Sequence, residues 1–240
     1  MPHPRLFRII ATLLLLPLAG AGAAQVPPSA EERSRYAGLF AAALAGHARA
    51  IERLVKSGGQ PVDARDAHGR TPLHVAAYAR QHDAMRALVQ SGANPNALDR
   101  DRYDIVTIAA VADDVPTLDT ALALGASAKN VTSPYDGTAL IAAAHLGHDG
   151  VVRTLIRAGA PLDHVNNLGW TAVIESIVLG DGGPRHQATL QALVNAGANV
   201  DLADRNGQTP LALARSRGYE QMIDILRKAR ANCARRPHRR

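Results

Sequence analysis

A short apolar block recurs along the chain about every 33 residues. The blocks begin at Leu39, Leu73, Val106, Leu140, Val173 and Leu211, at spacings of 34, 33, 34, 33 and 38 residues. In each of the first four units a glycine follows 19 residues after the block begins, where a helix C-terminus needs a left-handed backbone. This period predicts six units of two short helices and a loop. Because one such pair cannot bury its own apolar face, we expect the units to stack into an elongated solenoid.

The second unit shows the expected elements most clearly. Thr71 can cap the first helix, and Pro72 occupies the first turn, where a missing amide hydrogen costs nothing. Apolar residues continue at helical spacing, and a second apolar run at 85–89 predicts the partner helix. The stretch 94–101 is rich in Asn, Asp and Pro, which favours a loop leading to the next unit.

Three segments carry a recognisable signature. Residues 69–77 read Gly-Arg-Thr-Pro-Leu-His-Val-Ala-Ala, and shorter versions stand at 136–140 and 207–211. These segments resemble the signature of the ankyrin repeat family, and the resemblance extends over roughly residues 34–228. It implies an all-α ankyrin-repeat solenoid of about six helix-turn-helix units with finger loops. It also implies a concave face, made of fingers and first helices, that binds a protein and performs no catalysis.

The N-terminus differs in composition from the rest. Arg5 and Arg8 precede an apolar run at 9–18, and small residues follow at 19–24, a pattern typical of a cleaved secretory signal. We therefore expect a signal peptide at 1–24, a linker at 25–33, six repeats over 34–228 and a basic tail at 229–240. The expected location is periplasmic or secreted.

Charge and composition narrow the partners. The chain is 47% hydrophobic and only 3% aromatic, with one cysteine, so small aliphatic side chains must form the core without disulfides within the chain. The formal net charge is +6. The whole of this excess comes from the two termini, because residues 25–226 hold more acidic than basic groups. The sequence thus predicts a monomer with no nucleic-acid partner and no membrane span.

The third and fourth units depart from the signature. Residues 104–107 read Asp-Ile-Val-Thr in place of Thr-Pro-Leu-His, and Arg102 stands where a finger glycine is expected. We expect this third unit to be the least rigid part of the stack. Before the fourth unit, one extra residue within 130–136 should reshape the finger.

The fifth unit places a carboxylate in an apolar column. Glu175 stands where the other units have Ala, Val, Ile, Ala and Leu. A carboxylate at such a place must be paired, protonated or exposed by a local rearrangement. Arg215 in the next unit is a candidate partner. Either a structural pair or a contact with a ligand fits this pattern, and the longer connection at 180–187 fits a surface loop.

A metal or haem site is the alternative to a binding scaffold. His145 and His148 lie three residues apart, and Glu175 could join them, so haem, metal or small-molecule handling is the second hypothesis. However, Gly147-His148 matches a position that the ankyrin family often fills for structural reasons, and no third ligand is evident. We expect no cofactor, no metal and no enzymatic activity. His74 is expected to form hydrogen bonds between adjacent loops.

The resemblance also indicates which residues face the concave side. Aromatic, arginine and apolar residues at these positions are typical of interface hot spots. The mapping adds Leu146 and Leu179 on the first helices. The predicted function is an exported scaffold that binds one protein, as an accessory to an oxidative-stress enzyme or an antagonist of a toxin. The candidate partner-binding residues are Arg70, Tyr78, Leu98, Arg100, Tyr103, Tyr135, His145, Val165, Leu168, Trp170, Arg205 and Gln208.

Overall fold

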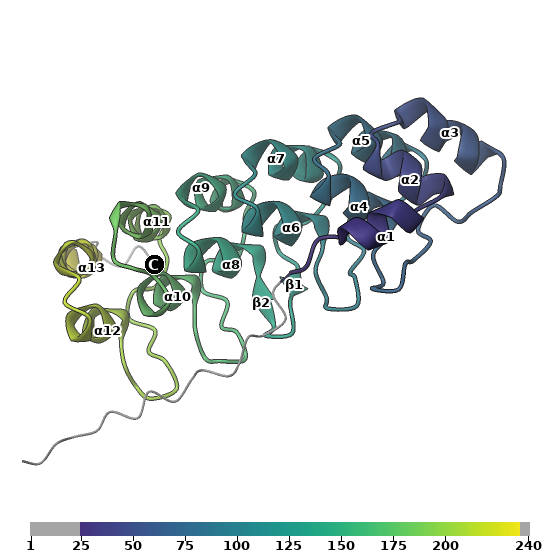
Figure 1. The fold of residues 1–240 in the computed structure, drawn as a ribbon. Helices are drawn as coiled ribbons and strands as arrows, with labels where there is room; N and C mark the ends of the chain where they lie inside the picture. The colour runs from purple at the N-terminus through teal and green to yellow at the C-terminus, as the bar shows by residue number, and fades with distance from the viewer. Residues whose placement is uncertain (1–24, 236–240) are drawn as a thin grey trace, which may run out of the picture.

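The computed structural model describes residues 25–235, and this part of the chain is a row of six helix pairs. Figure 1 shows the pairs side by side, with the loops that join them projecting to one side. Each first helix packs against the first helices of its neighbours, and each second helix does the same in a parallel layer. The predicted all-α solenoid of six repeats is confirmed.

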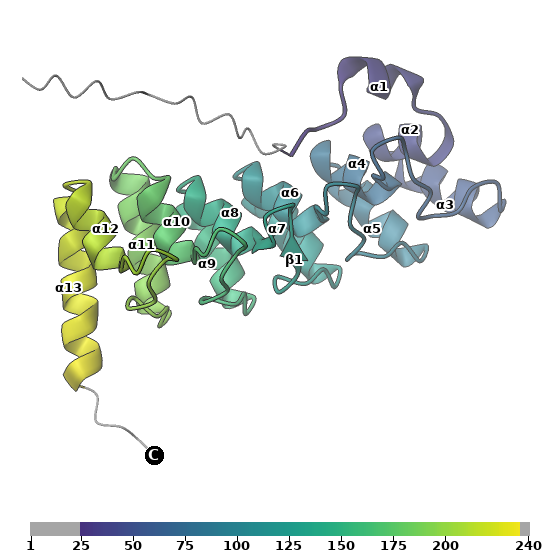
Figure 2. The same ribbon diagram turned by 90° about the horizontal axis from the view of Figure 1, so that it is seen from below.

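The repeats have closely similar elements. The first, inner helices are α2 (Gly38–Leu44), α4 (Pro72–Tyr78), α6 (Ile105–Val111), α8 (Ala139–His145), α10 (Ala172–Val178) and α12 (Pro210–Ser216). The second, outer helices are α3 (Ala48–Lys56), α5 (His82–Gln90), α7 (Val115–Ala123), α9 (Asp149–Arg157), α11 (Pro184–Asn195) and α13 (Glu220–Arg235). A further helix, α1 (Ala30–Arg35), precedes the first repeat and lies on the side of the inner helices (Figure 2).

Side-chain caps determine where the inner helices begin. Thr71, Thr138, Thr171 and Thr209 each accept a hydrogen bond from the backbone amide three residues later. In the third repeat Asp104 performs the same role, accepting from the amide of Thr107. The departure from the signature in this repeat therefore leaves the helix capped.

The core lies between the two helix layers and between neighbouring repeats. It consists of small and medium aliphatic side chains such as Leu73, Leu140 and Val173, all nearly inaccessible to solvent. Alanines such as Ala76, Ala109 and Ala143 are also buried in the inner helices, so small side chains contribute to the packed interior of a chain with few aromatic residues. Stability therefore depends on contacts between adjacent repeats.

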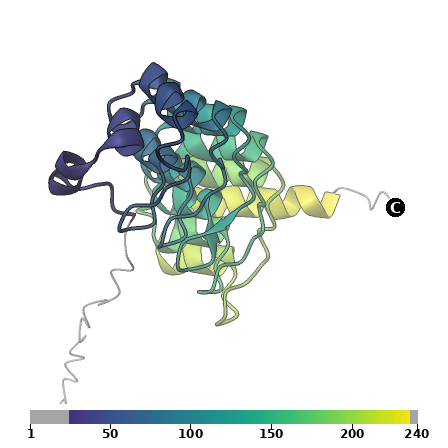
Figure 3. The same ribbon diagram turned by 90° about the vertical axis from the view of Figure 1, so that its right-hand side faces the viewer.

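The fingers are joined to one another through their backbones. The Arg100 amide donates to the His68 carbonyl, and the Asn167 amide donates to the Tyr135 carbonyl. The extra residue before the fourth repeat is accommodated in a small antiparallel hairpin of β1 (Val131–Thr132) and β2 (Gly137–Thr138). Figure 3, which views the stack from the end that carries the first repeats, shows the loops projecting together to one side. They form one wall of the concave face, and the inner helices form its floor.

Parts of the expected linker and of the expected basic tail are helical in the structure. Residues 25–33 are not simply a linker, because Ser29 and Glu32 form a capping box that starts α1. At the other end α13 continues past residue 228 to Arg235, so the basic tail begins as a helix. The predicted signal peptide and residues 236–240 lie outside the described residues. Within 25–235, no helix has the length and apolar character needed to cross a bilayer.

Candidate functional site

The concave face divides into a part covered by the chain itself and a part that is open. Residues before the first repeat lie over repeats two and three, with α1 close to the second finger. The Glu32 carboxylate pairs with Arg70 and lies 2.9 Å from the His68 ring. The Tyr36 hydroxyl donates to Asp66 over 2.8 Å. These contacts hold α1 against the second finger.

Arg70 is consequently part of the fold. The sequence predicts it on the partner-binding face, but its side chain is only 2% exposed, between Asp66 and Glu32. Its guanidinium donates to Asp66 over 2.7 Å. The neighbouring guanidinium lowers the pKa of the Glu32 carboxyl, after a larger contribution from the Ser29 backbone amide. A partner therefore cannot reach Arg70 while α1 is in place.

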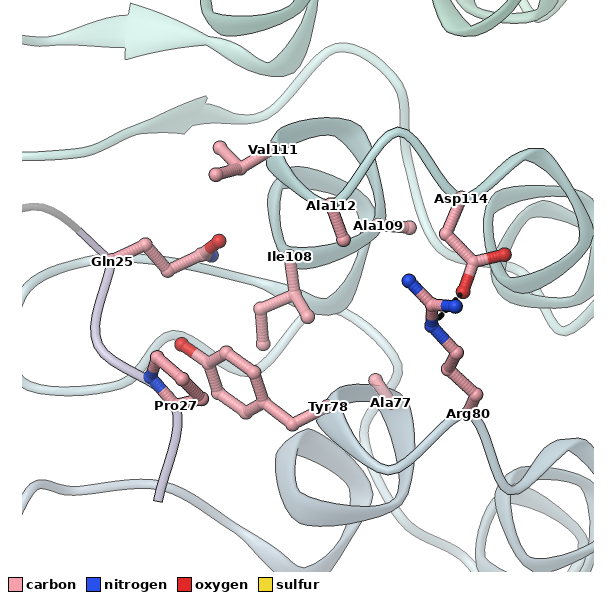
Figure 4. Close-up of a pocket in the computed structure, with 10 residues that line it drawn as sticks. All are labelled: Gln25, Pro27, Ala77, Tyr78, Arg80, Ile108, Ala109, Val111, Ala112 and Asp114. Atoms are coloured by element: carbon pink, nitrogen blue, oxygen red, sulfur yellow. Dashed lines mark ion pairs between the residues drawn. The ribbon is translucent and has the colours of Figure 1, made fainter. Parts of the chain in front are cut away.

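A pocket of about 260 Å³ lies between the N-terminal segment and the inner helices of repeats two and three. Figure 4 shows Gln25 and Pro27 beside Tyr78, opposite Ile108 and Val111. The Tyr78 hydroxyl is buried and has no hydrogen-bond partner among the described residues. Burial raises the pKa of Tyr78 above its usual value. The predicted site residue Tyr78 thus lies under the chain's own N-terminal segment.

Tyr103 also differs from its predicted role. It is only 8% exposed, so it offers little surface to a partner. Its backbone carbonyl accepts a hydrogen bond from His74 Nε2 at 3.1 Å, since His74 Nδ1 already accepts from the Thr71 amide. This bond confirms the predicted role of His74 between adjacent loops. Leu98 is half-buried and Arg100 is exposed, so the third finger retains part of its predicted surface.

Repeats four and five carry an open apolar surface. We call Leu146, Val165, Leu168, Trp170 and Leu179 the open patch. Four of them are exposed by 40–51%, which is unusual for large aliphatic residues, and Trp170 is half-buried. Among the described residues the only other large apolar side chains with comparable exposure are Val26 and Val131, and Val131 belongs to the adjoining hairpin. Exposed apolar groups therefore concentrate on these two repeats.

The edges of the open patch are polar. His145 is exposed at the end of α8, and Tyr135 is half-buried in the fourth finger. Arg205 and Gln208 are exposed in the sixth finger. The predicted site residues of repeats four to six are therefore exposed or half-buried, whereas Arg70 and Tyr103 in the preceding fingers are buried. An apolar centre with a polar rim is typical of protein interfaces.

Glu175 lies in the floor beside the open patch, with its side chain 5% exposed. Asn166 Nδ2 donates to Glu175 Oε1 over 2.9 Å, and His145 Nδ1 lies 3.5 Å from Oε2. Burial raises the Glu175 pKa to about 7, although the Asn166 hydrogen bond partly opposes this shift. The expected partner Arg215 is wrong. Its side chain points to solvent, and within residues 25–235 it makes no ion pair with Glu175.

The histidines of this region are occupied by structural contacts. His148 Nδ1 bonds the Ala110 carbonyl at 2.9 Å, and His186 Nε2 bonds the His145 carbonyl at 2.9 Å. His186 Nδ1 also lies 2.7 Å from Asp181, so His186 joins the longer connection of repeat five to the end of α8. Burial, together with His186 and His148, lowers the pKa of His145. Within residues 25–235 no three His, Cys, Asp or Glu side chains are placed to hold a metal ion together.

Two residues of this site are missing from the sequence prediction. Asn166 accepts hydrogen bonds from the Leu168 and Trp170 amides while donating to Glu175, so it holds both the finger and the carboxylate. The second is His186, whose Nε2 bonds the His145 carbonyl at the end of α8. The available signal in the sequence is a substitution at one finger position. Three other fingers have aspartate there (Asp66, Asp99 and Asp204), whereas the repeat with the buried glutamate has asparagine.

Comparisons with known proteins agree with this architecture. The chain is 33% identical over 169 residues to the ankyrin repeat protein YahD of Escherichia coli K12, covering 70% of this chain and 84% of that protein. It is 30% identical over 229 residues to human B-cell lymphoma 3 protein, of which it spans about half, 49%. An ankyrin repeat domain from Acinetobacter baumannii AYE superposes with a TM-score of 0.71 and 41% identity, covering 80% of this chain and 96% of that domain.

The family model described as ankyrin repeats in three copies matches residues 10–99 and 106–202. Proteins of this family are typically scaffolds for protein-protein interaction and generally lack catalytic activity. The period, the capped inner helices, the linked fingers and these matches lead to one conclusion. The chain belongs to the ankyrin repeat family.

Proposed function

We propose that this protein is a non-catalytic scaffold that binds one protein partner through the open patch of repeats four and five. The observation that carries the proposal is the concentration of exposed aliphatic side chains there, beside the half-buried Trp170. Isolated exposed leucines are common, but a group of exposed apolar side chains promotes aggregation unless a partner covers it. A partner that covers this group removes its apolar surface from water.

The geometry of the patch favours a protein partner over a small molecule. Leu168 and Trp170 lie on a finger, whereas Leu146 and Leu179 lie at the ends of two inner helices. A surface spread over two repeats presents several separate contacts, which suits an extended or convex protein segment. The pocket found beneath the N-terminal segment lies instead on repeats two and three.

The N-terminal segment supports this choice of repeats. Because Gln25, Pro27 and α1 occupy the concave side of repeats two and three, the corresponding residues there contact the chain itself. Repeats four and five carry no such cover from residues 25–36. A partner can therefore bind them without displacing any part of the described chain.

We further propose that the partner is met outside the cytoplasm. The support is the N-terminal pattern of basic residues, an apolar run and small residues. An exported scaffold of this kind fits a role as accessory to an oxidative-stress enzyme or as antagonist of a toxin. N-terminal sequencing of the protein from its native host tests this: a start at Ala24 or Gln25 is expected, and an intact Met1 in a cytosolic fraction contradicts it.

The binding proposal is tested with variants and the partner captured from a periplasmic extract. Trp170→Ala should weaken binding by about 2 kcal/mol or more, since a hot-spot residue loses its buried contact only in the complex. Its effect on unfolding should be much smaller. Arg157→Ala on outer helix α9 is the control, and it should change binding by only a few tenths of a kcal/mol, about the effect of a typical surface substitution.

Titration calorimetry and thermal unfolding of both variants separate the two explanations. If Trp170→Ala binds as tightly as the unaltered protein, the open patch is not the interface. If its loss of binding equals its loss of stability, Trp170 belongs to the fold and the proposal fails. A selective loss of binding supports the proposal.

A further inference from the structure

Glu175 is a buried carboxylate for which the fold supplies no strong cation. Across residues 25–235 no Lys or Arg forms an ion pair with it. The basic residue on the adjacent outer helix, Arg185, is instead paired with Asp113 at 2.6 Å and lies 3.8 Å from Asp149. Burying a carboxylate without a partner is costly, so a fold seldom keeps one in an apolar column without a use for it.

The two carboxylate oxygens have different surroundings. Oε1 accepts the hydrogen bond from Asn166, which itself is fixed by two finger amides. Oε2 faces His145 Nδ1 at 3.5 Å, beyond an ordinary hydrogen bond. The His145 side chain is 47% exposed, so Oε2 lies behind a side chain that borders solvent. A group approaching along the concave face past His145 meets this oxygen.

His145 is a weak counter-ion for Glu175. Burial and the neighbouring His186 and His148 lower its pKa, which favours the neutral imidazole near neutral pH. The position next to Oε2 therefore calls for a positive charge that repeat five does not provide. A positive charge from a bound partner would stabilise the ionised form of Glu175 at this place.

Exposed apolar side chains stand near Glu175: Leu179 is one helical turn further along α10, and Leu146 follows His145. Leu146 and Leu179 are 40% and 42% exposed at the ends of α8 and α10, and Ala142, which occupies the place of Glu175 in α8, is half-buried. The aliphatic stem of a long basic side chain can lie along such a surface while its charged head reaches a carboxylate. Apolar walls around one acid are thus suited to a lysine or an arginine.

We propose that repeats four and five recognise a protein segment that inserts a Lys or Arg side chain between Leu146 and Leu179 to pair with Glu175 Oε2. This inference rests on the proposed function, because it specifies the partner chemistry at the open patch. This ion pair would also discriminate between partners, because a partner with an apolar residue at the same place leaves the Glu175 carboxylate buried without a counter-charge. Partners lacking the basic residue are therefore disfavoured.

The probe is a library of random dodecapeptides displayed on phage and selected on the immobilised protein. Selections are run on the unaltered protein, on Glu175→Gln and on Glu52→Gln, a matched control on outer helix α3. Glutamine keeps the shape of the side chain and can still accept from Asn166. Leu179→Ala then identifies which recovered peptides bind at the open patch.

Peptides from the unaltered protein and from Glu52→Gln should share a Lys or Arg beside apolar residues, and those from Glu175→Gln should not. One synthetic peptide is then measured with its basic residue intact or replaced by Met. We expect the replacement to weaken binding to the unaltered protein about tenfold or more and to leave binding to Glu175→Gln nearly unchanged.

Two results overturn the inference in distinguishable ways. If peptides require Leu179 but show no basic preference, or if the replacement costs the same in both proteins, Glu175 does not read a cation and the binding scaffold stands. If the recovered peptides bind Leu179→Ala and Trp170→Ala as tightly as they bind the unaltered protein, the open patch is not the binding surface. The proposed function and this inference then fail together.

Discussion

Glu175→Gln should make the protein more stable at alkaline pH and leave its stability unchanged in acid. In the folded protein burial raises the Glu175 pKa to about 7 from an ordinary value of 4.5. The folded state therefore holds a proton between these values that the unfolded chain has lost, and stability falls as pH rises across this window. The full shift corresponds to about 3 kcal/mol above pH 7. Glutamine removes this penalty because it carries no charge.

Urea unfolding at several pH values between 4 and 8 measures the effect. The single tryptophan, Trp170, reports on the repeat that contains Glu175. With a denaturant slope of about 3 kcal/mol per molar, the variant's midpoint should exceed that of the unaltered protein by about 1 M urea at pH 8. The difference should vanish near pH 4. Glu52→Gln, which removes an exposed carboxylate, should show no such pH-dependent difference.

The groups around the Glu175 carboxylate determine how it titrates. Asn166 and His145 contact Glu175, and His186 lies behind His145. If the stability difference between Glu175→Gln and the unaltered protein is constant from pH 4 to pH 8, Glu175 does not titrate abnormally in the fold. The description of it as a buried acid without a strong counter-ion is then incorrect.

Three further outcomes follow from the packing. Leu73→Ala should cost about 2 to 5 kcal/mol in urea unfolding, because it leaves a cavity between repeats, and a cost below 1 kcal/mol contradicts the nearest-neighbour account. Arg70→Met should free α1, so that amide exchange in Ala30–Arg35 quickens while the outer helices keep their rates; unchanged exchange in α1 means that other contacts hold it. Amides of 105–112 should exchange faster than those of 172–178, because Arg102 adopts a left-handed backbone where the fifth finger has Gly169; equal protection refutes a softer third repeat.

The solenoid could be predicted from the sequence because the features that determine it are local and recur in each repeat. The apolar period, the Thr and Pro at helix starts and the glycines at helix ends each act within one repeat. The same holds for His74, whose contact with the next finger belongs to the repeated signature. Even the third repeat, which lacks Thr-Pro, could be placed because Asp104 is also a good cap.

The candidate site was only partly predictable because its features depend on single long-range contacts. Position in the repeat placed Arg70 on the concave face, but its burial depends on Glu32, which lies 38 residues earlier and outside the repeat pattern. The Ser29 to Glu32 capping box was a local signal for α1, yet nothing local indicates where that helix packs. Glu175 was noticeable because the other repeats have apolar residues at the aligned position. Its hydrogen-bond partner Asn166 differs from the aspartate of other fingers only by an amide in place of a carboxylate.

The most direct test of the proposed interface is hydrogen-deuterium exchange of the protein alone and in complex with its captured partner. We predict slower exchange of the amides in 145–147, 165–170 and 178–181, which border the open patch. Exchange in outer helices α9 and α11 should not change on binding. Protection confined to those outer helices, or to the covered repeats two and three, contradicts the claim that the open patch of repeats four and five binds the partner.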